Sequence, residues 1–201
     1  MEYVPFDSSM MGRGILIVHF VDTSDNEWTL MTSHLESMKG RSKFSGLGLF
    51  RISGYRKPRM QQFNEILKYA KQYSNRKVVF GGDFNMRDTE LKDIDDSAYF
   101  KQNITDSWIK AGNDTNKYTW DLGKSNKLFS GINIHLVIND NKILDLPFQP
   151  RCRFDRVYFN SNVNCHSFTL EGQEKIKKDE ITGNNVDKFI SDHFALAVDV
   201  Q

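Results

Sequence analysis

Four short polar clusters contain the side chains that transfer protons and bind metal ions: carboxylates, imidazoles and an amide. They are residues 32–37 (Thr-Ser-His-Leu-Glu-Ser), 81–85 (Gly-Gly-Asp-Phe-Asn), 153–156 (Arg-Phe-Asp-Arg) and 191–193 (Ser-Asp-His). Each cluster adjoins a run rich in β-branched and aromatic residues, which is typical of a strand. An Asp-His pair or an Asp-Phe-Asn triplet recurs by chance. All four clusters together, each tied to a strand, indicate a shared functional site.

The elements that must position these clusters can be predicted from hydrophobic periodicity. Residues 14–20 and 28–34 are β-rich runs separated by the polar stretch 22–26, which predicts a hairpin. Residues 59–73 carry apolar side chains three and four positions apart, which predicts an amphipathic helix. Residues 77–80 form an apolar run that leads into the Gly-Gly-Asp cluster. A helix, a strand and a functional loop in this order favour a layered α/β domain.

The second half of the chain predicts two further strands, over residues 154–159 and 194–200, the latter with apolar side chains at alternate positions. Two stretches fit this pattern poorly, and we interpret both as loops or insertions. Residues 44–58 carry glycine and arginine without periodicity, and residues 132–150 interrupt two polar motifs with the apolar run 132–138.

Composition narrows the class of protein. The 201 residues are enough for one sizeable core, so we expect one domain. The 27 Lys and Arg residues nearly balance the 26 Asp and Glu residues, so any DNA contact must come from local patches. Cys152 and Cys165 are too few for a disulfide scaffold and favour a reducing compartment. No apolar run approaches the ~20 residues of a membrane span, and we expect no membrane contact.

The order Ser-His-Leu, Gly-Asp-x-Asn, Phe-Asp-Arg and Ser-Asp-His resembles the endonuclease/exonuclease/phosphatase superfamily. The segments that look like its tyrosyl-DNA phosphodiesterase branch are residues 30–37, 82–88, 118–121 and 153–156. Apart from the two suspected insertions, the resemblance covers nearly the whole chain. It implies an α/β (α+β) fold of two packed β-sheets flanked by helices, in a four-layer sandwich.

The family pattern opens with a strand that bears an asparagine and with a Gln-Glu motif whose glutamate is the main magnesium ligand. Neither motif occurs here, and residues 1–6 resemble the middle of the family domain. Glu2 and Glu36 lack the required context. We therefore expect residues 1–201 to form the C-terminal two-thirds of one domain, incomplete at the N-terminus.

The resemblance also implies catalytic roles. Hydrolysis of a phosphodiester requires a positioned water and stabilisation of charge on the phosphate oxygens. Asp83 is the expected base for that water, and Asn85 is expected to hold the water or a phosphate oxygen. His34 and His193 are expected to donate to the phosphate. Asp155 is the expected carboxylate partner that favours the charged form of His193.

Metal and substrate contacts are implied in the same way. Asp192 is expected to assist near the metal, directly or through water. An oxygen-lined site favours Mg²⁺, with Mn²⁺ as the alternative. The residues expected to bind the single-stranded 5' end combine arginine charge with aromatic stacking, together with one hydroxyl: Ser37, Arg87, Trp120, Arg153 and Phe154.

These expectations describe a magnesium-dependent 5'-tyrosyl-DNA phosphodiesterase that releases a trapped topoisomerase tyrosine from a DNA 5' end during repair. Its partners would be DNA 5' ends with tyrosyl adducts and the topoisomerase-derived peptide. We expect a monomer in the nucleus, with the cytoplasm as a second compartment. The alternatives are an inactive remnant that binds DNA or protein, and another magnesium-dependent phosphodiesterase of the superfamily.

Ordinary structural roles compete with these assignments. The structural alternative for His34 is a hydrogen-bonding role at a strand end. The structural alternative for Asp83 is a turn or helix-cap role. Asp155 and Arg156 have the alternative of a surface ion pair, worth at most ~1 kcal/mol. Trp120 has the alternative of a core aromatic, and the sequence leaves that choice open. The joint pattern favours function for His34 and Asp83.

Overall fold

The computed structural model describes most of the chain, in seven stretches. They are residues 1–37, 56–94, 97–121, 133–138, 142–147, 151–178 and 185–201. No helix among these residues is long and apolar enough to cross a membrane.

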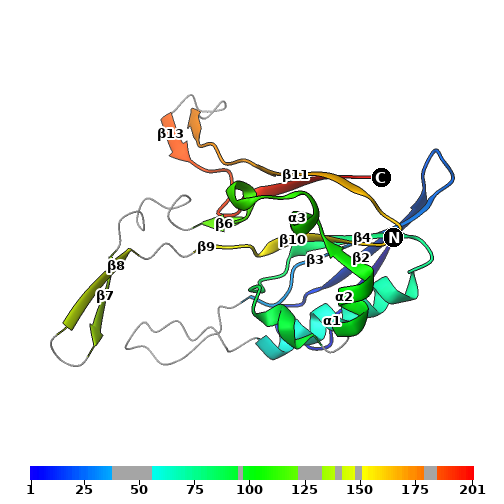
Figure 1. The fold of residues 1–201 in the computed structure, drawn as a ribbon, viewed down its shortest axis with the longest axis horizontal. Helices are drawn as coiled ribbons and strands as arrows, with labels where there is room; N and C mark the ends of the chain where they lie inside the picture. The colour runs from blue at the N-terminus through cyan, green and yellow to red at the C-terminus, as the bar shows by residue number, and fades with distance from the viewer. Residues whose placement is uncertain (38–55, 95–96, 122–132, 139–141, 148–150, 179–184) are drawn as a thin grey trace.

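A six-stranded sheet, the first sheet, forms the centre of the fold (Figure 1). Its strands, in spatial order, are β1 (Glu2–Pro5), β2 (Gly14–Val21), β3 (Glu27–Ser33), β4 (Lys77–Asp83), β10 (Asp155–Asn160) and β5 (Ile104–Asp106). All neighbours are antiparallel except β3 and β4, which are parallel. The parallel pair needs a crossover connection, and the helix between these two strands belongs to it.

The β2–β3 hairpin confirms the predicted turn. The Asp22 carboxylate accepts hydrogen bonds from the backbone N–H groups of Ser24 (2.8 Å) and Asn26 (3.0 Å) and from the indole of Trp28 (2.9 Å). Such aspartate-stabilised turns fix the register of a hairpin. That register places Ile15 opposite Ser33, directly before His34.

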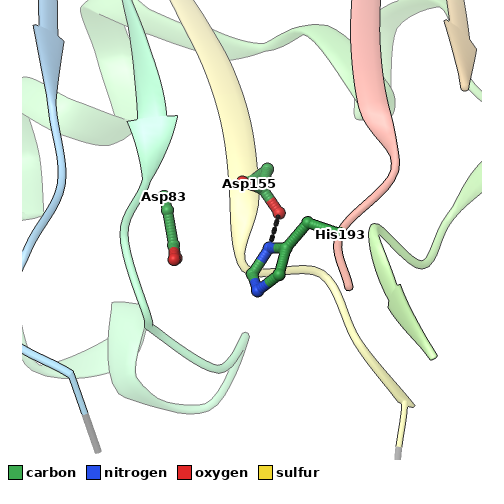
Figure 2. A group of neighbouring side chains, drawn as sticks. All are labelled: Asp83, Asp155 and His193. Atoms are coloured by element: carbon green, nitrogen blue, oxygen red, sulfur yellow. Dashed lines mark hydrogen bonds and ion pairs between the residues drawn. The ribbon is translucent and has the colours of Figure 1, made fainter. Parts of the chain in front are cut away.

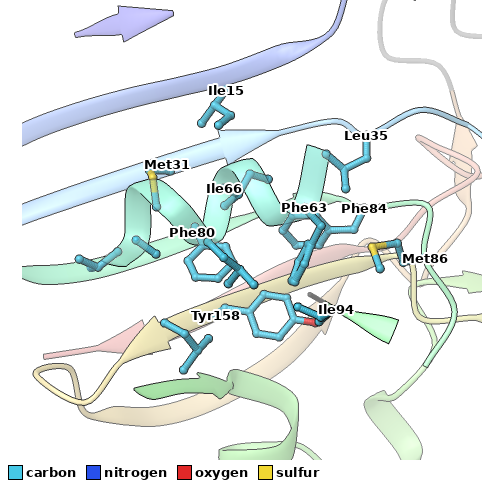
Figure 3. Close-up of a cluster of buried hydrophobic side chains, with 14 of the residues drawn as sticks. Ile15, Met31, Leu35, Phe63, Ile66, Phe80, Phe84, Met86, Ile94 and Tyr158 are labelled. Carbon is cyan, nitrogen blue, oxygen red and sulfur yellow. The ribbon is translucent and has the colours of Figure 1, made fainter. Parts of the chain in front are cut away.

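Helix α1 (Arg56–Gln72) confirms the helix predicted over residues 59–73. Together with α2 (Ser97–Asn103), it covers one face of the first sheet. The main hydrophobic core lies between these helices and the sheet (Figure 3). Phe63 of α1 is fully buried there, 5.8 Å from the ring of Tyr158 and 6.4 Å from that of Phe80. Burial of one such side chain stabilises the fold by about 1.5–3 kcal/mol.

A second sheet lies on the opposite face and consists of β11 (Cys165–Glu171) and β14 (Ala195–Val200). Trp28 and Phe159 of the first sheet cluster with Cys165 of β11, and Val198 of β14 packs against them. Helix α3 (Ser107–Ala111) contacts β11 and β10. Two packed sheets with helices on the outer face of the first sheet confirm the predicted fold class.

The remaining elements are short pairs and turns around this centre. Strands β6 (Trp120–Asp121) and β9 (Arg151–Cys152) pair, as do β12 (Ile176–Lys178) and β13 (Asn185–Lys188). The short helices η1 (Glu90–Asp93) and η2 (Asp114–Asn116) complete the described elements.

The two stretches interpreted as loops or insertions have different outcomes. Residues 132–150 are not simply a loop, because β7 (Asn133–Ile138) and β8 (Lys142–Pro147) form an antiparallel pair that stands away from the two sheets (Figure 1). A short apolar run such as residues 132–138 does not by itself reveal a strand, because periodicity alone cannot separate it from other buried segments. Of residues 44–58, the last three begin α1 and the others lie outside the described residues. Whether either stretch is an insertion stays a prediction.

Candidate active site

Four strand ends bring the predicted catalytic side chains to one place. Asp83 is the last residue of β4 and lies opposite Asp155, the first residue of β10, in the antiparallel register. His34 directly follows β3, and His193 lies two residues before β14. Figure 2 shows Asp83 on one side and the hydrogen-bonded Asp155 and His193 on the other. The structure therefore gathers residues that are spread over most of the sequence.

Asp155 and His193 form a close pair. The His193 Nδ1 atom lies 2.7 Å from Asp155 Oδ2, and the two side chains are 24% and 21% exposed. This hydrogen bond raises the pKa of His193, although burial acts in the opposite direction. Thr119 fixes the backbone next to both residues of the pair. Its hydroxyl accepts a hydrogen bond from the backbone N–H of Asp155 (3.1 Å), and its carbonyl accepts one from the backbone N–H of Phe194 (2.7 Å). No specific role for Thr119 is predicted from the Tyr-Thr-Trp-Asp motif in which it lies.

Asp83 and His34 form a second pair. The His34 Nε2 atom lies 3.1 Å from Asp83 Oδ2, and the other carboxylate oxygen accepts the backbone N–H of Asn85 (2.8 Å). Burial, followed by the nearby charge of Asp155, raises the pKa of Asp83. Burial also lowers the pKa of His34, against the opposing effect of Asp83. A carboxylate with a raised pKa accepts a proton more readily, which suits a general base.

Two unusual backbone conformations set the position of Asp83. Gly82 has φ = +139°, and a Cβ atom there would lie 2.0 Å from the carbonyl oxygen of Ser33. Only glycine permits this approach of β4 to the end of β3. Asn85 has φ = +50°, and its side-chain amide donates to the carbonyl of Leu35 (3.1 Å). Asn85 therefore ties the loop after β4 to the loop after β3, and its contact with water or phosphate stays a prediction.

The same residues include a group that can hold a metal ion. One ligand atom each from Asp83, Asp155 and His193 lie within 4.8 Å of one another. Two carboxylates and one imidazole suit a divalent cation, and the carboxylates suit a hard one. Asp192 is exposed and is not part of this group, but its charge raises the pKa of His193. Its role near a metal stays a prediction.

Aromatic rings extend from the Asp155–His193 pair. The Phe154 ring lies 6.2 Å from the His193 ring and 5.6 Å from the Trp120 ring. Trp120 is half-buried, so it keeps part of its surface for a ligand and is not a fully enclosed core residue. Arg87 is exposed two residues after Asn85, and Ser37 lies half-buried three residues after His34. Their substrate contacts stay predictions.

Arg153 is placed differently from the expectation that it lines a DNA groove. Its guanidinium is 4% exposed and donates to both carboxylate oxygens of Asp106, at 2.7 and 2.6 Å. A second nitrogen reaches Asp88 at 3.1 Å, and the group lies 4.8 Å from the Trp108 ring. The observed role of Arg153 is therefore to join β5 to the loop after β4. Sequence reasoning missed this because Asp106 is distant in the chain.

Arg156 belongs to the same buried network. Its guanidinium is 1% exposed and donates to Asp88 at 2.7 Å. Burial acts to raise the pKa of Asp88, but Arg156 and then Arg153 outweigh it and lower that pKa. Since Asp155 pairs with His193 and Arg156 with Asp88, the alternative of a surface ion pair between Asp155 and Arg156 is wrong.

Sequence reasoning also missed a loop that borders the site. The fully buried Glu36 carboxylate accepts hydrogen bonds from the hydroxyl of Ser9 (2.9 Å) and the backbone N–H of Met10 (3.1 Å). Arg13, from the same loop, donates to the carbonyl of Leu35. Burial lowers the pKa of Arg13, while Glu36 and Asp83 oppose that effect. A guanidinium thus lies beside the His34–Asp83 pair.

Comparisons with known proteins agree with this geometry. No family model matches. Tyrosyl-DNA phosphodiesterase 2 of Xenopus tropicalis is 33% identical over 205 residues, which are 98% of this chain and 44% of that protein. A crystal structure of Danio rerio tyrosyl-DNA phosphodiesterase 2 complexed with a single-strand DNA product has a TM-score of 0.69 at 24% identity, and covers 100% of this chain and 66% of its own. An endonuclease/exonuclease/phosphatase family protein of Bacteroides thetaiotaomicron has a TM-score of 0.60 at 13% identity, over 100% of this chain and 64% of its own.

The fold is similar to that of the endonuclease/exonuclease/phosphatase superfamily, and the site contains two histidine–aspartate pairs at neighbouring strand ends. The chain spans less than half the length of the curated relative from Xenopus tropicalis. Within the superfamily, it belongs to the tyrosyl-DNA phosphodiesterase branch.

Proposed function

We propose that this chain provides the catalytic site of a magnesium-dependent 5'-tyrosyl-DNA phosphodiesterase. The observation that carries the proposal is the convergence of two histidine–aspartate pairs, His34 with Asp83 and His193 with Asp155, at neighbouring strand ends. This arrangement places proton acceptors and proton donors around one small volume. Its presence in a member of the tyrosyl-DNA phosphodiesterase branch favours that reaction over other phosphodiester hydrolysis.

The roles of the residues follow from their protonation. Asp83, whose pKa is raised by burial, takes a proton from the attacking water. His193 is held in its charged form by Asp155 and donates a hydrogen bond to a phosphate oxygen as negative charge develops there. His34, with its lowered pKa, orients the Asp83 carboxylate. Mg²⁺ would neutralise charge on the phosphate, and we assign the exposed Asp192 to assist it, directly or through water.

Substrate binding uses the aromatic surface beside His193. We assign stacking of the 5' nucleotide to the half-buried Trp120, at about 1–3 kcal/mol per base. Phe154 is 8% exposed and packs against the Trp120 ring. The exposed Arg87 would contact the DNA backbone. The Danio rerio relative was crystallised with a single-strand DNA product. The peptide partner from a topoisomerase, the monomeric state and the nuclear compartment belong to the same proposal.

A direct assay tests this function. Residues 1–201 would be incubated with Mg²⁺ and an oligonucleotide that carries a 5'-phosphotyrosine, and release of tyrosine would be measured. We expect hydrolysis that EDTA abolishes and that Asp25→Asn, an exposed change in the β2–β3 turn at the far end of β3, leaves intact. Absence of tyrosine release by the folded wild-type chain would refute the proposal.

A DNA-binding module without turnover is the second candidate. Glu36, the carboxylate nearest His34 in the sequence, is fully buried and bonded to Ser9 and Met10, so among the described residues the metal group contains two carboxylates. Fluorescence anisotropy with a labelled single-stranded oligonucleotide separates the two candidates. Binding that Trp120→Ala weakens, without any hydrolysis, would favour the module.

A further inference from the structure

Cationic groups and aromatic rings alternate on the surface around the start of β6 and β9, which run side by side (Figure 1). The Lys117 Nζ atom lies 4.7 Å from the centre of the Trp108 ring and 5.7 Å from that of the Tyr118 ring. The Arg151 guanidinium lies 4.4 Å from the centre of the same Tyr118 ring. Such distances allow cation–π attraction. We call these four residues, Trp108, Lys117, Tyr118 and Arg151, the cation–aromatic row.

The charges of the cation–aromatic row are not neutralised by carboxylates. Arg153, on the other side of the Trp108 ring from the sequence standpoint of β9, is buried and donates to both oxygens of Asp106. In contrast, Arg151 is exposed and Lys117 is half-buried. Within the part of the chain that the structure describes, neither forms an ion pair. A ring covers the face of a guanidinium and leaves the N–H groups at its edge for a ligand.

The cation–aromatic row is continuous with the surface assigned to the 5' nucleotide. Tyr118 precedes Trp120 by two residues, so their Cα atoms lie at most about 7 Å apart. Trp120 also pairs with Cys152 of β9. Burial raises the pKa of Cys152, and Arg87 opposes this more than any other charge does. Arg87 therefore lies near β9 as well, and it belongs with the row to one basic surface beside Trp120.

We propose that the cation–aromatic row is a second nucleotide subsite, which binds backbone phosphates on the 3' side of the nucleotide stacked on Trp120. This inference rests on the proposed DNA substrate. The formal net charge of the chain is +1, so attraction of a DNA strand must come from a local patch. Arg151 supplies a planar fork that fits a phosphate, and Lys117 supplies a point charge. The row continues from the ring that stacks the nucleotide, which favours the DNA strand over the peptide attached to the tyrosine.

Binding of reaction products tests the subsite without turnover. Fluorescence anisotropy would give the Kd of residues 1–201 for a labelled 5'-phosphorylated dodecathymidylate, and competition would give the Kd for thymidine 5'-monophosphate. We expect Arg151→Gln to raise the Kd for the dodecamer by at least about fivefold and to raise that for the mononucleotide by much less. The slope of log K against log salt should also fall by about 0.7, because one phosphate contact is lost. Because no bond is cleaved, failure of hydrolysis would refute the proposed function and leave this readout intact.

Matched variants separate the row from charge in general. Lys117→Gln should act in the same direction as Arg151→Gln, whereas Lys68→Gln removes an exposed lysine of α1, on the outer face of the first sheet, and should leave the dodecamer Kd unchanged. Arg151→Lys keeps the charge and loses the fork, so the Kd should rise while the salt slope stays close to that of wild type. Wild-type protein that binds the dodecamer no more tightly than the mononucleotide would overturn the proposal. So would Arg151→Gln that weakens both ligands equally, or that weakens only ligands carrying a peptide on the tyrosine.

Discussion

His34 and His193 each face an aspartate, yet their pKa values are shifted in opposite directions. His193 donates a 2.7 Å hydrogen bond to the half-buried Asp155 carboxylate, and this bond raises the pKa of His193. His34, whose side chain is 57% exposed, lies 3.1 Å from Asp83, and the partial burial of its ring lowers its pKa against the attraction of that carboxylate. The two similar pairs therefore have different roles at one site. In the His193–Asp155 pair the imidazole holds a proton, and in the His34–Asp83 pair the carboxylate accepts one.

Removal of the Asp83 charge is expected to have the largest effect on the rate of hydrolysis. We expect Asp83→Asn to lower the rate of phosphotyrosyl hydrolysis by about 10²–10⁴-fold, because the general base is lost. The folded pKa of Asp83 is raised above its unfolded value, so the ionised carboxylate destabilises the folded state at neutral pH. The melting temperature should therefore stay the same or rise. A variant that loses activity together with its melting transition would show that Asp83 is merely structural.

A change at Asp155 acts on the proton held by His193. Asp155→Asn removes the charged partner of the hydrogen bond, so we expect the pKa of His193 to fall. The rate of hydrolysis should drop by about 10–100-fold, since a neutral imidazole stabilises the phosphate charge less well. NMR titration of the His193 ring measures the pKa directly. Unchanged titration of His193 in this variant would contradict the role given to the pair.

The smallest expected effect concerns stability. The pKa of His193 is higher in the folded state than in the unfolded state, where it is about 6.5. Its charged hydrogen bond therefore stabilises the folded state fully below pH ~6.5, and this stabilisation is lost as pH rises through the folded pKa. We expect His193→Gln to cost about 1–2 kcal/mol at pH 6 and less at pH 9. Urea unfolding at the two pH values provides the measurement. An equal cost at both would mean that the bond does not depend on charge.

Much of the scaffold was predictable because its patterns are local. The β2–β3 hairpin, α1, β4, β10 and β14 each carry a periodic run of apolar residues or a turn with clear chemistry. The four polar clusters also follow or precede these strands directly, so their meeting at one end of the sheets followed from strand order. Hydrophobic periodicity and turn residues are enough for this level of description.

The features that sequence reasoning missed depend on contacts between distant segments. Arg153 looks like a DNA ligand until Asp106 neutralises it inside the protein. The loop that carries Ser9 and Arg13 has no periodicity, and the pairing of β2 with β3 brings it next to Glu36. Thr119 binds the backbone of Asp155 through its hydroxyl, a role that any threonine in a loop could have had. Residue type alone does not reveal such partners.

The central claim is that the two pairs act as one catalytic unit. A double-mutant cycle tests it most directly, with single-turnover rates of phosphotyrosyl hydrolysis for wild type, Asp83→Asn, Asp155→Asn and the double variant. If both aspartates serve the same phosphate, the double variant should be about as slow as the slower single variant. A rate for the double variant that equals the product of the two single effects would contradict the claim and would assign the pairs to independent tasks.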